Sequence, residues 1–395
     1  MALTRKEIGQ RLRDVRETIG FTQAQVAEKF DVHRPTISEI EAGRRAVTSE
    51  ELYRFAELYA TAVSDLLADP KPSTEAAVEV LYRRQGAERP ETRVAIRRFV
   101  ERCRAEHELE DLLGLPPRTD ARPGYRATAP ATKGEAIQQG SRMAEQERRR
   151  LDIGGQPVRS VTELLERQGV TIGPVTPQGG DALDGFYLES EELGPCIAVN
   201  PGEEWTGLRA AFTAAHEYAH WLLRDRQVEL FAFQARTDDL LEVRANAFAA
   251  SFLMPEAGLR DYLDGVGLLE GNRAPHFSPG DVVRAMGHFG VSRTALLFRL
   301  LNLGLIDEPT RLELAQFAIA PIAKALQIDF GSRRYVGMRL PMLAIHAWRR
   351  GLIGASRAAS LCELDLAEYK QLVRDIGEEP EPSADTSLLG AAAVG

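Results

Sequence analysis

The sequence predicts an α+β protein that is mainly α-helical. Most of its 395 residues fall in segments whose apolar side chains recur at the three- and four-residue spacing of a helix. Three short apolar runs between residues 169 and 200 have the length and the flanking turns of β-strands. A proline-rich stretch, residues 115–132, interrupts the helical pattern. We therefore expect helical segments on both sides of this break and one small sheet after it.

Composition limits the class of protein. The length suggests two or three domains, and 44% hydrophobic with 27% charged residues is typical of a soluble globular chain. A net charge of −9 excludes a general attraction to nucleic acid or to a membrane. Three widely spaced cysteines predict neither a disulfide framework nor a cysteine zinc site. Because a secretory signal and a long apolar run are both lacking, we expect a cytoplasmic protein without a membrane partner.

Residues 1–70 are predicted to form a domain of five short helices. Two capping boxes, Thr22–Gln25 and Thr48–Glu51, mark helix starts, and Gly43 can end the third helix. A tight turn, residues 31–33, separates the second helix from the third. Two short helices joined in this way are typical of a helix-turn-helix.

This segment resembles the Xre (Cro/C1-type) family of DNA-binding domains in residues 20–23 and 32–43. The resemblance implies that the helix from Arg34 to Glu41 lies in the major groove of double-stranded DNA. It assigns contacts with bases or phosphates to six side chains: Gln23, Arg34, Thr36, Ser38, Glu39 and Arg44.

Two residues and the charge balance depart from the family pattern. His33 stands where these domains usually place a serine or threonine cap, and Glu39 adds negative charge to the recognition helix. Residues 1–70 contain ten Lys/Arg and twelve Asp/Glu, so a single copy should bind duplex DNA weakly. We therefore expect a homodimer that contacts two half-sites of an operator. The alternative is a helical docking domain without affinity for DNA.

Residues 71–134 are predicted to be a helical spacer that ends in a linker. Residues 76–82 and 94–103 have helical patterns with charged exposed faces. Between Leu115 and Thr132, four prolines and little apolar periodicity predict a flexible or semi-extended linker.

Residues 135–310 are predicted to form a second domain, in which the pattern H-E-x-x-H is the most specific feature. His216, Glu217 and His220 form this pattern in an apolar helical run that begins near Leu208. Residues four apart share one face of a helix, so the two histidines can hold one metal ion. Glu217 can then reach a water on the metal. The alternative is two core histidines beside a surface glutamate.

The other elements of this domain are short. The expected helices and strands are helices at 135–151 and 160–165 and strands at 169–172, 184–188 and 196–200. A small sheet beside a metal helix can bind an extended peptide by edge pairing, or it can simply support the helix.

A catalytic metal site requires a third protein ligand. The metzincin extension is excluded, because it requires a glycine and a histidine where Leu223 and Arg226 stand. Glu242 is the best candidate, since small residues on the same helical face would let its helix approach the histidines. Asn246, one turn later, can steady the Glu242 carboxylate. Rivals remain in the polar connection before it: Glu229, Asp238 and Asp239.

Residues 212–223 and 242–255 together resemble the ImmA/IrrE family of metallopeptidases, and the similarity extends from about residue 135 to residue 306. The resemblance implies a gluzincin-like domain in which His216, His220 and Glu242 bind Zn²⁺ and Glu217 is catalytic. Ala219 stands where glycine is common, and we expect no loss of activity from one added methyl. The oxyanion donor stays open among three residues: Tyr262, His276 and His288.

Residues 311–378 are predicted to be a C-terminal helical region, and residues 379–395 an acidic disordered tail. Helices are expected at 312–326, 340–349 and 356–376. The last of these faintly resembles another helix-turn-helix, although a packing or protein-interaction domain is the better supported alternative.

These features predict a DNA-binding transcriptional regulator with a zinc-dependent endopeptidase domain. The resemblance implies a protein substrate, such as a repressor whose cleavage derepresses stress or mobile-element genes. The alternative is a DNA-binding repressor or antitoxin of a toxin–antitoxin pair, whose peptidase-like domain mainly binds a partner such as the toxin.

Overall fold

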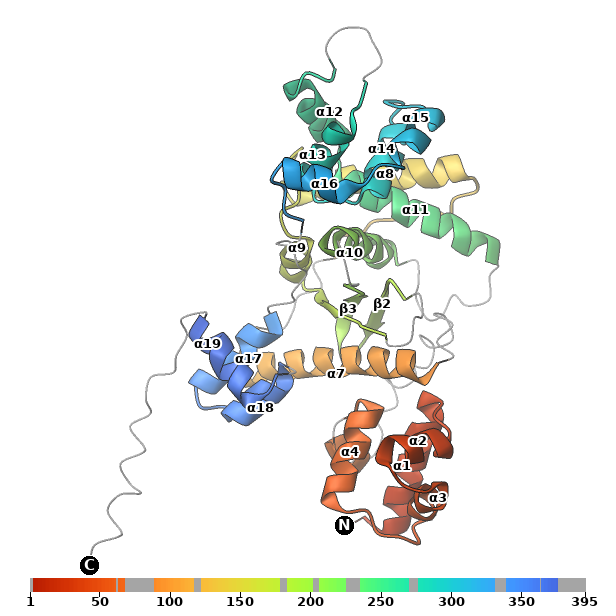
Figure 1. Cartoon of the computed structure of the whole chain (residues 1–395), viewed down its shortest axis with the longest axis vertical. Helices are drawn as coiled ribbons and strands as arrows, with labels where there is room; N and C mark the ends of the chain where they lie inside the picture. The colour runs from red at the N-terminus through yellow and green to blue at the C-terminus, as the bar shows by residue number, and fades with distance from the viewer. Residues whose placement is uncertain are drawn as a thin grey trace, which may run out of the picture. The chain divides into compact units, whose positions relative to one another are not determined.

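A computed structural model of the chain has the α+β, mainly α architecture that the sequence predicts (Figure 1). It describes residues 3–61, 63–67, 89–116, 122–177, 183–201, 206–224, 235–269, 276–330, 339–362 and 364–375. The predicted helix at 76–82, the rival ligand Glu229 and the predicted disordered tail at 379–395 lie outside these ranges. The described chain divides into two compact units, Met1–Phe99 with Asp120–Val336, and Val100–Thr119 with Gly337–Gly395.

Between residues 3 and 67, the described chain forms five helices: α1 (Arg5–Ile19), α2 (Gln23–Phe30), α3 (Arg34–Glu41), α4 (Ser49–Tyr59) and α5 (Val63–Leu67). Thr4, Thr22 and Thr48 each begin a helix with a capping box, which satisfies amide groups that the first turn leaves without acceptors. Their apolar faces meet in one core that includes fully buried Ile37 and Tyr59. The predicted five-helix arrangement therefore has its own core.

A three-stranded sheet lies in the second half of the first unit: β1 (Thr171–Pro174), β2 (Gly185–Ser190) and β3 (Gly194–Val199). β3 is central, because it pairs in parallel with β1 and antiparallel with β2. Ile197 stands opposite Ile172 on one side and opposite Tyr187 on the other. These strands lie within two residues of the predicted ones.

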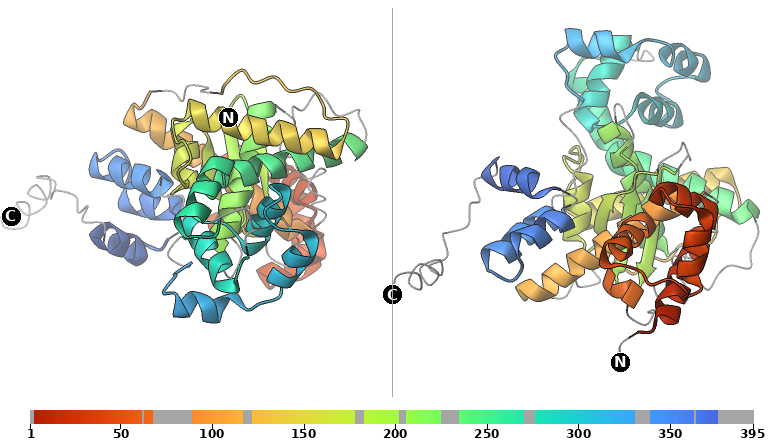
Figure 2. Two further views of the ribbon diagram at one scale, coloured as in Figure 1. Left: turned by 90° about the horizontal axis from the view of Figure 1, so that it is seen from above. Right: turned by 60° about the horizontal axis from the view of Figure 1, so that its bottom comes forward.

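Helices stack in layers on one face of the sheet (Figure 1). The apolar helix α10 (Thr206–Leu223) packs directly on β2 and β3. Above it lie α8 (Lys133–Arg150) and α11 (Ala235–Leu253), which run alongside one another in the view from above (Figure 2). A shorter helix, α9 (Val161–Arg167), joins α8 to β1 and contacts α10. On the other face, Phe186 is buried and meets the ring of Phe99 from α7 (Pro90–Leu113).

The close approach of α8 and α11 depends on Gly140. A Cβ atom at this position would lie 2.3 Å from the carbonyl oxygen of Arg244 and 2.8 Å from the amide nitrogen of Phe248. Both neighbours are backbone atoms of α11 and cannot move aside without moving that helix. Gly140 therefore sets the depth at which α11 packs.

Two buried arginines hold the C-terminal end of α11. Arg148 of α8 donates to the carbonyl oxygen of Phe252 at 2.5 Å, and Arg299 donates to that of Met254 at 3.0 Å. The last carbonyl groups of a helix have no partner within it, so these guanidinium groups supply the missing donors. Burial lowers the pKa of Arg148 to about 10, which still leaves it charged at neutral pH. The helix that carries Glu242 is thus anchored at its far end.

Five helices complete the first unit: α12 (Glu256–Gly265), α13 (Pro279–Phe289), α14 (Arg293–Asn302), α15 (Glu308–Leu314) and α16 (Ile319–Ala325). The single helix expected at 312–326 is wrong, because it is divided between α15 and α16. Pro321 explains the break, since its ring would clash with the carbonyl of Phe317 in a continuous helix. Leu314, Ala323 and Phe330 pack in the same core as the sheet and α10. This part of the predicted C-terminal region therefore belongs to the first unit.

The second unit contains α17 (Arg339–Arg349), α18 (Ala355–Leu361) and α19 (Leu366–Asp375), which pack on the C-terminal half of α7. The helix predicted at 356–376 is therefore two helices. Asp365 explains the second start, because its carboxylate accepts from the amides of Ala367 and Glu368 at 2.7 and 2.8 Å. Arg339 ties the unit together through ion pairs with Glu106 and Glu110.

The described end of the predicted linker, residues 122–132, has no regular secondary structure and packs on the rest of the first unit. Arg122 pairs with Glu189 of β2, and Tyr125 donates to Glu147 of α8. The proline pattern predicts a flexible or semi-extended linker, and it does not reveal these contacts. Among the described helices, none combines the length and the apolar character that a bilayer crossing requires.

Candidate functional site

Helix α10 presents the H-E-x-x-H residues from within the core. His220 is fully buried, the side chain of His216 is 14% exposed, and Glu217 is 4% exposed. The two imidazole rings lie 4.9 Å apart, as expected for residues one turn apart on a single face. Apolar neighbours on the other faces, including Ala215 and Trp221, bury the helix and explain why the run is apolar throughout.

Glu242 approaches these histidines from α11. Its Oε2 atom lies 3.0 Å from Nε2 of His216, and its Oε1 atom lies 3.5 Å from Nε2 of His220. The two Nε2 atoms are 3.2 Å apart. One ligand atom from each residue can therefore be chosen so that all three lie within 4.8 Å of one another, and the cluster could hold a metal ion. The structure brings these three residues together as the sequence analysis expected.

Asn246 also reaches this cluster. Its Oδ1 atom lies 3.0 Å from Nδ1 of His216, a contact in addition to the one with the Glu242 carboxylate that the sequence predicts. An amide oxygen only accepts, so Nδ1 is the donor in this contact, and Nε2 is the ring nitrogen that lies near Glu242. Asn246 and Glu242 lie one turn apart on α11. Their spacing in the sequence alone therefore does not show that Asn246 also reaches His216 on α10.

A buried carboxylate, Glu147 of α8, lies behind the metal helix and was not predicted. It is fully buried, and it accepts hydrogen bonds from Tyr218 at 2.5 Å, from Tyr125 at 2.9 Å and from Arg150 at 2.6 and 2.9 Å. Burial, followed by the hydrogen bond with Glu147, raises the pKa of Tyr125 to about 12, and burial followed by the charge of Glu147 raises the pKa of Tyr218 well above its usual value. Both phenols therefore remain proton donors at neutral pH. Helical spacing from Gly140 places residue 147 on the buried face, a signal that could have revealed it.

The remaining sequence candidates lie elsewhere or cannot be described. Asp238 and Asp239 fall in the first turn of α11, but the structure does not describe their side chains. Tyr262 stacks on His288 with ring centroids 4.4 Å apart, and the two line a cavity of about 330 Å³. His276 is exposed just before α13. The described lining of that cavity does not include the His216 cluster.

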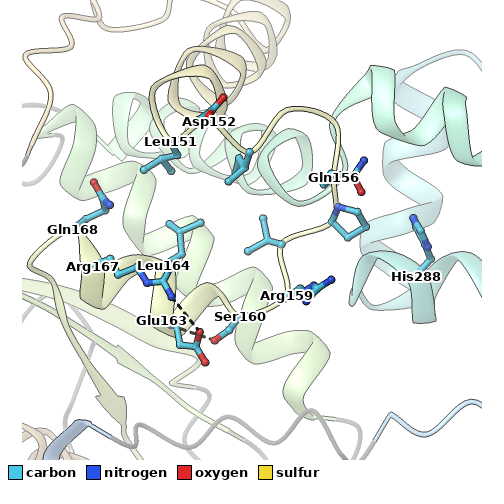
Figure 3. Close-up of a pocket in the computed structure, with 13 residues that line it drawn as sticks. Leu151, Asp152, Gln156, Arg159, Ser160, Glu163, Leu164, Arg167, Gln168 and His288 are labelled. Carbon is cyan, nitrogen blue, oxygen red and sulfur yellow. Dashed lines mark hydrogen bonds and ion pairs between the residues drawn. The ribbon is translucent and has the colours of Figure 1, made fainter.

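A larger cavity, of about 920 Å³, opens between α9, the α8–α9 connection and α13 (Figure 3). Apolar side chains such as Leu151 and Leu164 form part of the cavity wall, and His288 of α13 also lines the cavity. Figure 3 shows Arg167 turned toward Glu163, with which it forms an ion pair of 4.0 Å. None of the three clustered residues belongs to its lining, so this cavity is distinct from the cluster.

The predicted DNA-contacting residues gather on α3 and around its ends. Arg34, Glu39 and Arg44 are exposed, while Thr36 and Ser38 are partly exposed. His33 begins α3 without a side-chain cap, and Pro35 in the first turn has no amide hydrogen that would need one. Solvent therefore reaches all four predicted DNA-contacting residues of α3, and it also reaches Arg44.

Gln23, the sixth of these positions, belongs to a network that the sequence analysis missed. Its Nε2 atom donates to Glu41 at 2.9 Å, and Arg16 donates to the same carboxylate at 2.6 and 3.0 Å. The side chains of Arg16 and Glu41 are only 9% and 3% exposed. This buried pair ties the end of α3 to α1 and to the start of α2, so it orients the helix proposed to read DNA.

Comparison with known families agrees with both halves of this description. Residues 165–301 match the IrrE N-terminal-like domain, and residues 7–68 match a helix-turn-helix domain. No curated protein and no solved structure matches the chain. The first match covers the sheet, α10 and α11, and therefore the whole His216 cluster. The chain is thus a fusion of a helix-turn-helix domain with an IrrE N-terminal-like domain of the ImmA/IrrE type.

Proposed function

We propose that this protein is a DNA-binding regulator whose second domain is a zinc endopeptidase. Its substrate in this proposal is a protein partner, such as a repressor, whose cleavage changes transcription in a stress or mobile-element response. The observation that carries the proposal is the convergence of His216, His220 and Glu242 from two helices onto one point. The domain matches support peptidase and DNA-binding roles in one chain.

The donor set suits zinc. Two imidazole nitrogens and one carboxylate oxygen are ligands of catalytic zinc sites, which leave a fourth position open. Tetrahedral bonds of about 2.0–2.1 Å place neighbouring ligand atoms about 3.4 Å apart. The separations of 3.0, 3.2 and 3.5 Å in the cluster are close to that value. Asn246, by holding the Nδ1 proton of His216, keeps the ligating nitrogen free.

Glu217 is the proposed general base and acid. Zinc in this position would act as a Lewis acid toward water and toward the scissile carbonyl. The Glu217 carboxylate takes a proton from the attacking water as the new C–O bond forms, and it then gives the proton to the amine as the C–N bond breaks. Because Glu217 is 4% exposed, little solvent competes for that proton.

The sheet offers a place for an extended substrate. β1 and β2 are the outer strands of the described sheet, and each has one side that β3 does not occupy. An extended peptide can pair with such an edge through main-chain hydrogen bonds. This arrangement supports binding of a protein segment rather than of a small molecule.

Metal analysis tests the ligand assignment. We expect the purified native protein to hold one zinc ion per chain, and Glu242→Ala to weaken zinc binding by about 100-fold or more, because one of three ligands is lost. Competition with a chromogenic chelator measures the affinity, and Glu256→Ala, an exposed position on α12, is the control. Equal zinc affinity in Glu242→Ala and native protein would contradict the assignment. Bound zinc without cleavage of any partner would instead favour a partner-binding role.

DNA binding is tested at α3. We propose that α3 enters the major groove, with Arg34, Thr36, Ser38 and Glu39 near bases and Gln23 and Arg44 near phosphates.

Arg34→Ala is expected to weaken binding to the DNA upstream of the gene by about 1–3 kcal/mol. Fluorescence anisotropy at fixed salt measures this change, with Arg13→Ala on the exposed face of α1 as the control. The stoichiometry of the same titration tests the expected homodimer. Unchanged affinity of Arg34→Ala for this DNA would contradict the proposed placement of α3 in the major groove.

A further inference from the structure

The segment from residue 122 to residue 128, here called the strap, contacts both helices that carry the clustered metal-binding residues. It follows residues 117–121 directly and is therefore the part of the chain through which the N-terminal region is connected to the metal cluster. Its backbone has no regular secondary structure. Three of its contacts lead to α10 or α11, two of them directly and one through the buried carboxylate of Glu147.

The first contact is made by Arg122. Its side chain is only 3% exposed, it pairs with Glu189 of β2, and its guanidinium group lies 5.0 Å above the ring of Trp221. Trp221 is fully buried and directly follows His220. A cation above an indole ring is attracted to its electron-rich face, more strongly where water is excluded. Arg122 therefore contacts α10 at Trp221, the residue next to the proposed ligand His220.

The second contact is made by Tyr125. Its hydroxyl group donates to Glu147, the buried carboxylate that also accepts from Tyr218. Tyr218 directly follows Glu217 on α10. Because Glu147 is fully buried, each donor to it is held in a fixed direction, and the strap shares this carboxylate with the metal helix.

The third contact involves Arg244 of α11, two residues after Glu242. Arg244 is 1% exposed, and its Nη1 atom donates to the backbone oxygen of Thr128 at 3.1 Å and to Gln139 at 2.9 Å. The strap therefore supplies one acceptor to a buried charge on the second ligand-bearing helix. A buried guanidinium requires such acceptors, since it remains charged at any accessible pH.

These contacts can be broken without leaving a buried charge alone. If the strap left, Glu147 would keep Arg150 and Tyr218, and Arg244 would keep Gln139. Glu189 has a side chain that is 35% exposed and would be hydrated. Release of the strap would therefore loosen α10 and α11 beside the metal cluster rather than unfold the domain.

We infer that Arg122 and Tyr125 are positioning residues, and that docking of the strap sets the relative placement of α10 and α11 on which metal affinity depends. The inference rests on the proposed zinc site. It gives the connection to the N-terminal region an effect on the metal cluster, because the strap lies between that region and the two helices in the chain.

The test uses full-length Arg122→Leu, Tyr125→Phe and the double variant. Zinc affinity is measured by chelator competition, and the visible absorption bands of Co²⁺ in the site report its coordination geometry. We expect zinc affinity to fall about 10- to 100-fold in the double variant, as on loss of other residues that orient ligands. The Co²⁺ bands should shift, and Arg122→Lys should recover part of both properties because it keeps the charge.

Arg126→Gln is the matched control, since Arg126 lies in the same segment but is exposed. Unchanged zinc affinity and Co²⁺ bands in the double variant would overturn the inference. A lower melting temperature of the metal-free protein with unchanged zinc affinity would also overturn it, because the strap would then be structural only. Absence of peptidase activity in the native protein would refute the proposed cleavage and leave these metal measurements informative.

Discussion

Replacement of Glu217 by glutamine is expected to abolish cleavage while the metal site stays intact. Glutamine has the same shape as glutamate and fits a position that is only 4% exposed, so packing of α10 should not change. It cannot accept the proton of the attacking water, however. Loss of a general base lowers the rate by about 10²- to 10⁴-fold. The measurement is single-turnover cleavage of candidate repressors, followed by electrophoresis and mass spectrometry.

Zinc content and a matched variant separate this effect from misfolding. Glu256→Gln changes the same chemical group on the surface of α12 and should cleave at the native rate. Zinc affinity in Glu217→Gln should equal that of the native protein, because Glu217 is not one of the three clustered ligands. Cleavage at the native rate by Glu217→Gln would falsify the proposed role of this residue.

Removal of Glu41 is expected to have the largest effect on stability of the N-terminal domain. The Arg16–Glu41 pair is buried, and hydrogen bonding with Glu41 raises the pKa of Arg16. In Glu41→Ala the guanidinium would keep its bond to the carbonyl oxygen of Phe21 and its contact of 3.2 Å with half-exposed Glu17, but it would lose its buried counter-charge. Breaking one side of a buried pair costs about 3–5 kcal/mol. Hydrogen exchange of the amides in α1 and α3 measures the loss locally, which is necessary in a chain with several domains.

An exposed pair in the same helix provides the control. Arg13 and Glu17 form an ion pair whose side chains are about half exposed, so Arg13→Ala should leave the stability of the domain almost unchanged. Replacing both buried partners, as in Arg16→Met with Glu41→Leu, should recover most of the stability lost in Glu41→Ala. Equal protection of α3 in Glu41→Ala and native protein would show that the pair does not hold the recognition helix.

Different contacts stabilise the two domains, and the strap lies between them in the sequence. The helix-turn-helix domain has its own core and a buried ion pair that orients α3. The clustered residues His216, His220 and Glu242 lie on α10 and α11. Glu147 accepts a hydrogen bond from Tyr218 of α10, Arg148 donates to the C-terminal end of α11, and Gly140 allows α8 to pack closely against α11. A regulator that reports DNA binding to a peptidase would need a connection of this kind.

The sequence by itself determined those features that depend on short-range chemistry. Capping boxes at Thr22 and Thr48 set helix starts because the hydroxyl group and the amides that it accepts from lie within three residues. His216 and His220 share a face because of the helical repeat, and Glu242 was found from the small residues near it. The failures were also local in origin, since Pro321 and Asp365 each divide a helix whose apolar pattern runs on.

Only the tertiary structure decided contacts between residues far apart in the chain. Asn246 reaches His216 on the other helix, and Arg122 reaches Trp221 across about a hundred residues of sequence. Glu147 lies in a run of charged residues that is typical of a solvated helix end, yet the packed structure buries it completely. A charged side chain can be buried wherever the fold brings it partners, and no local pattern records which partners will arrive.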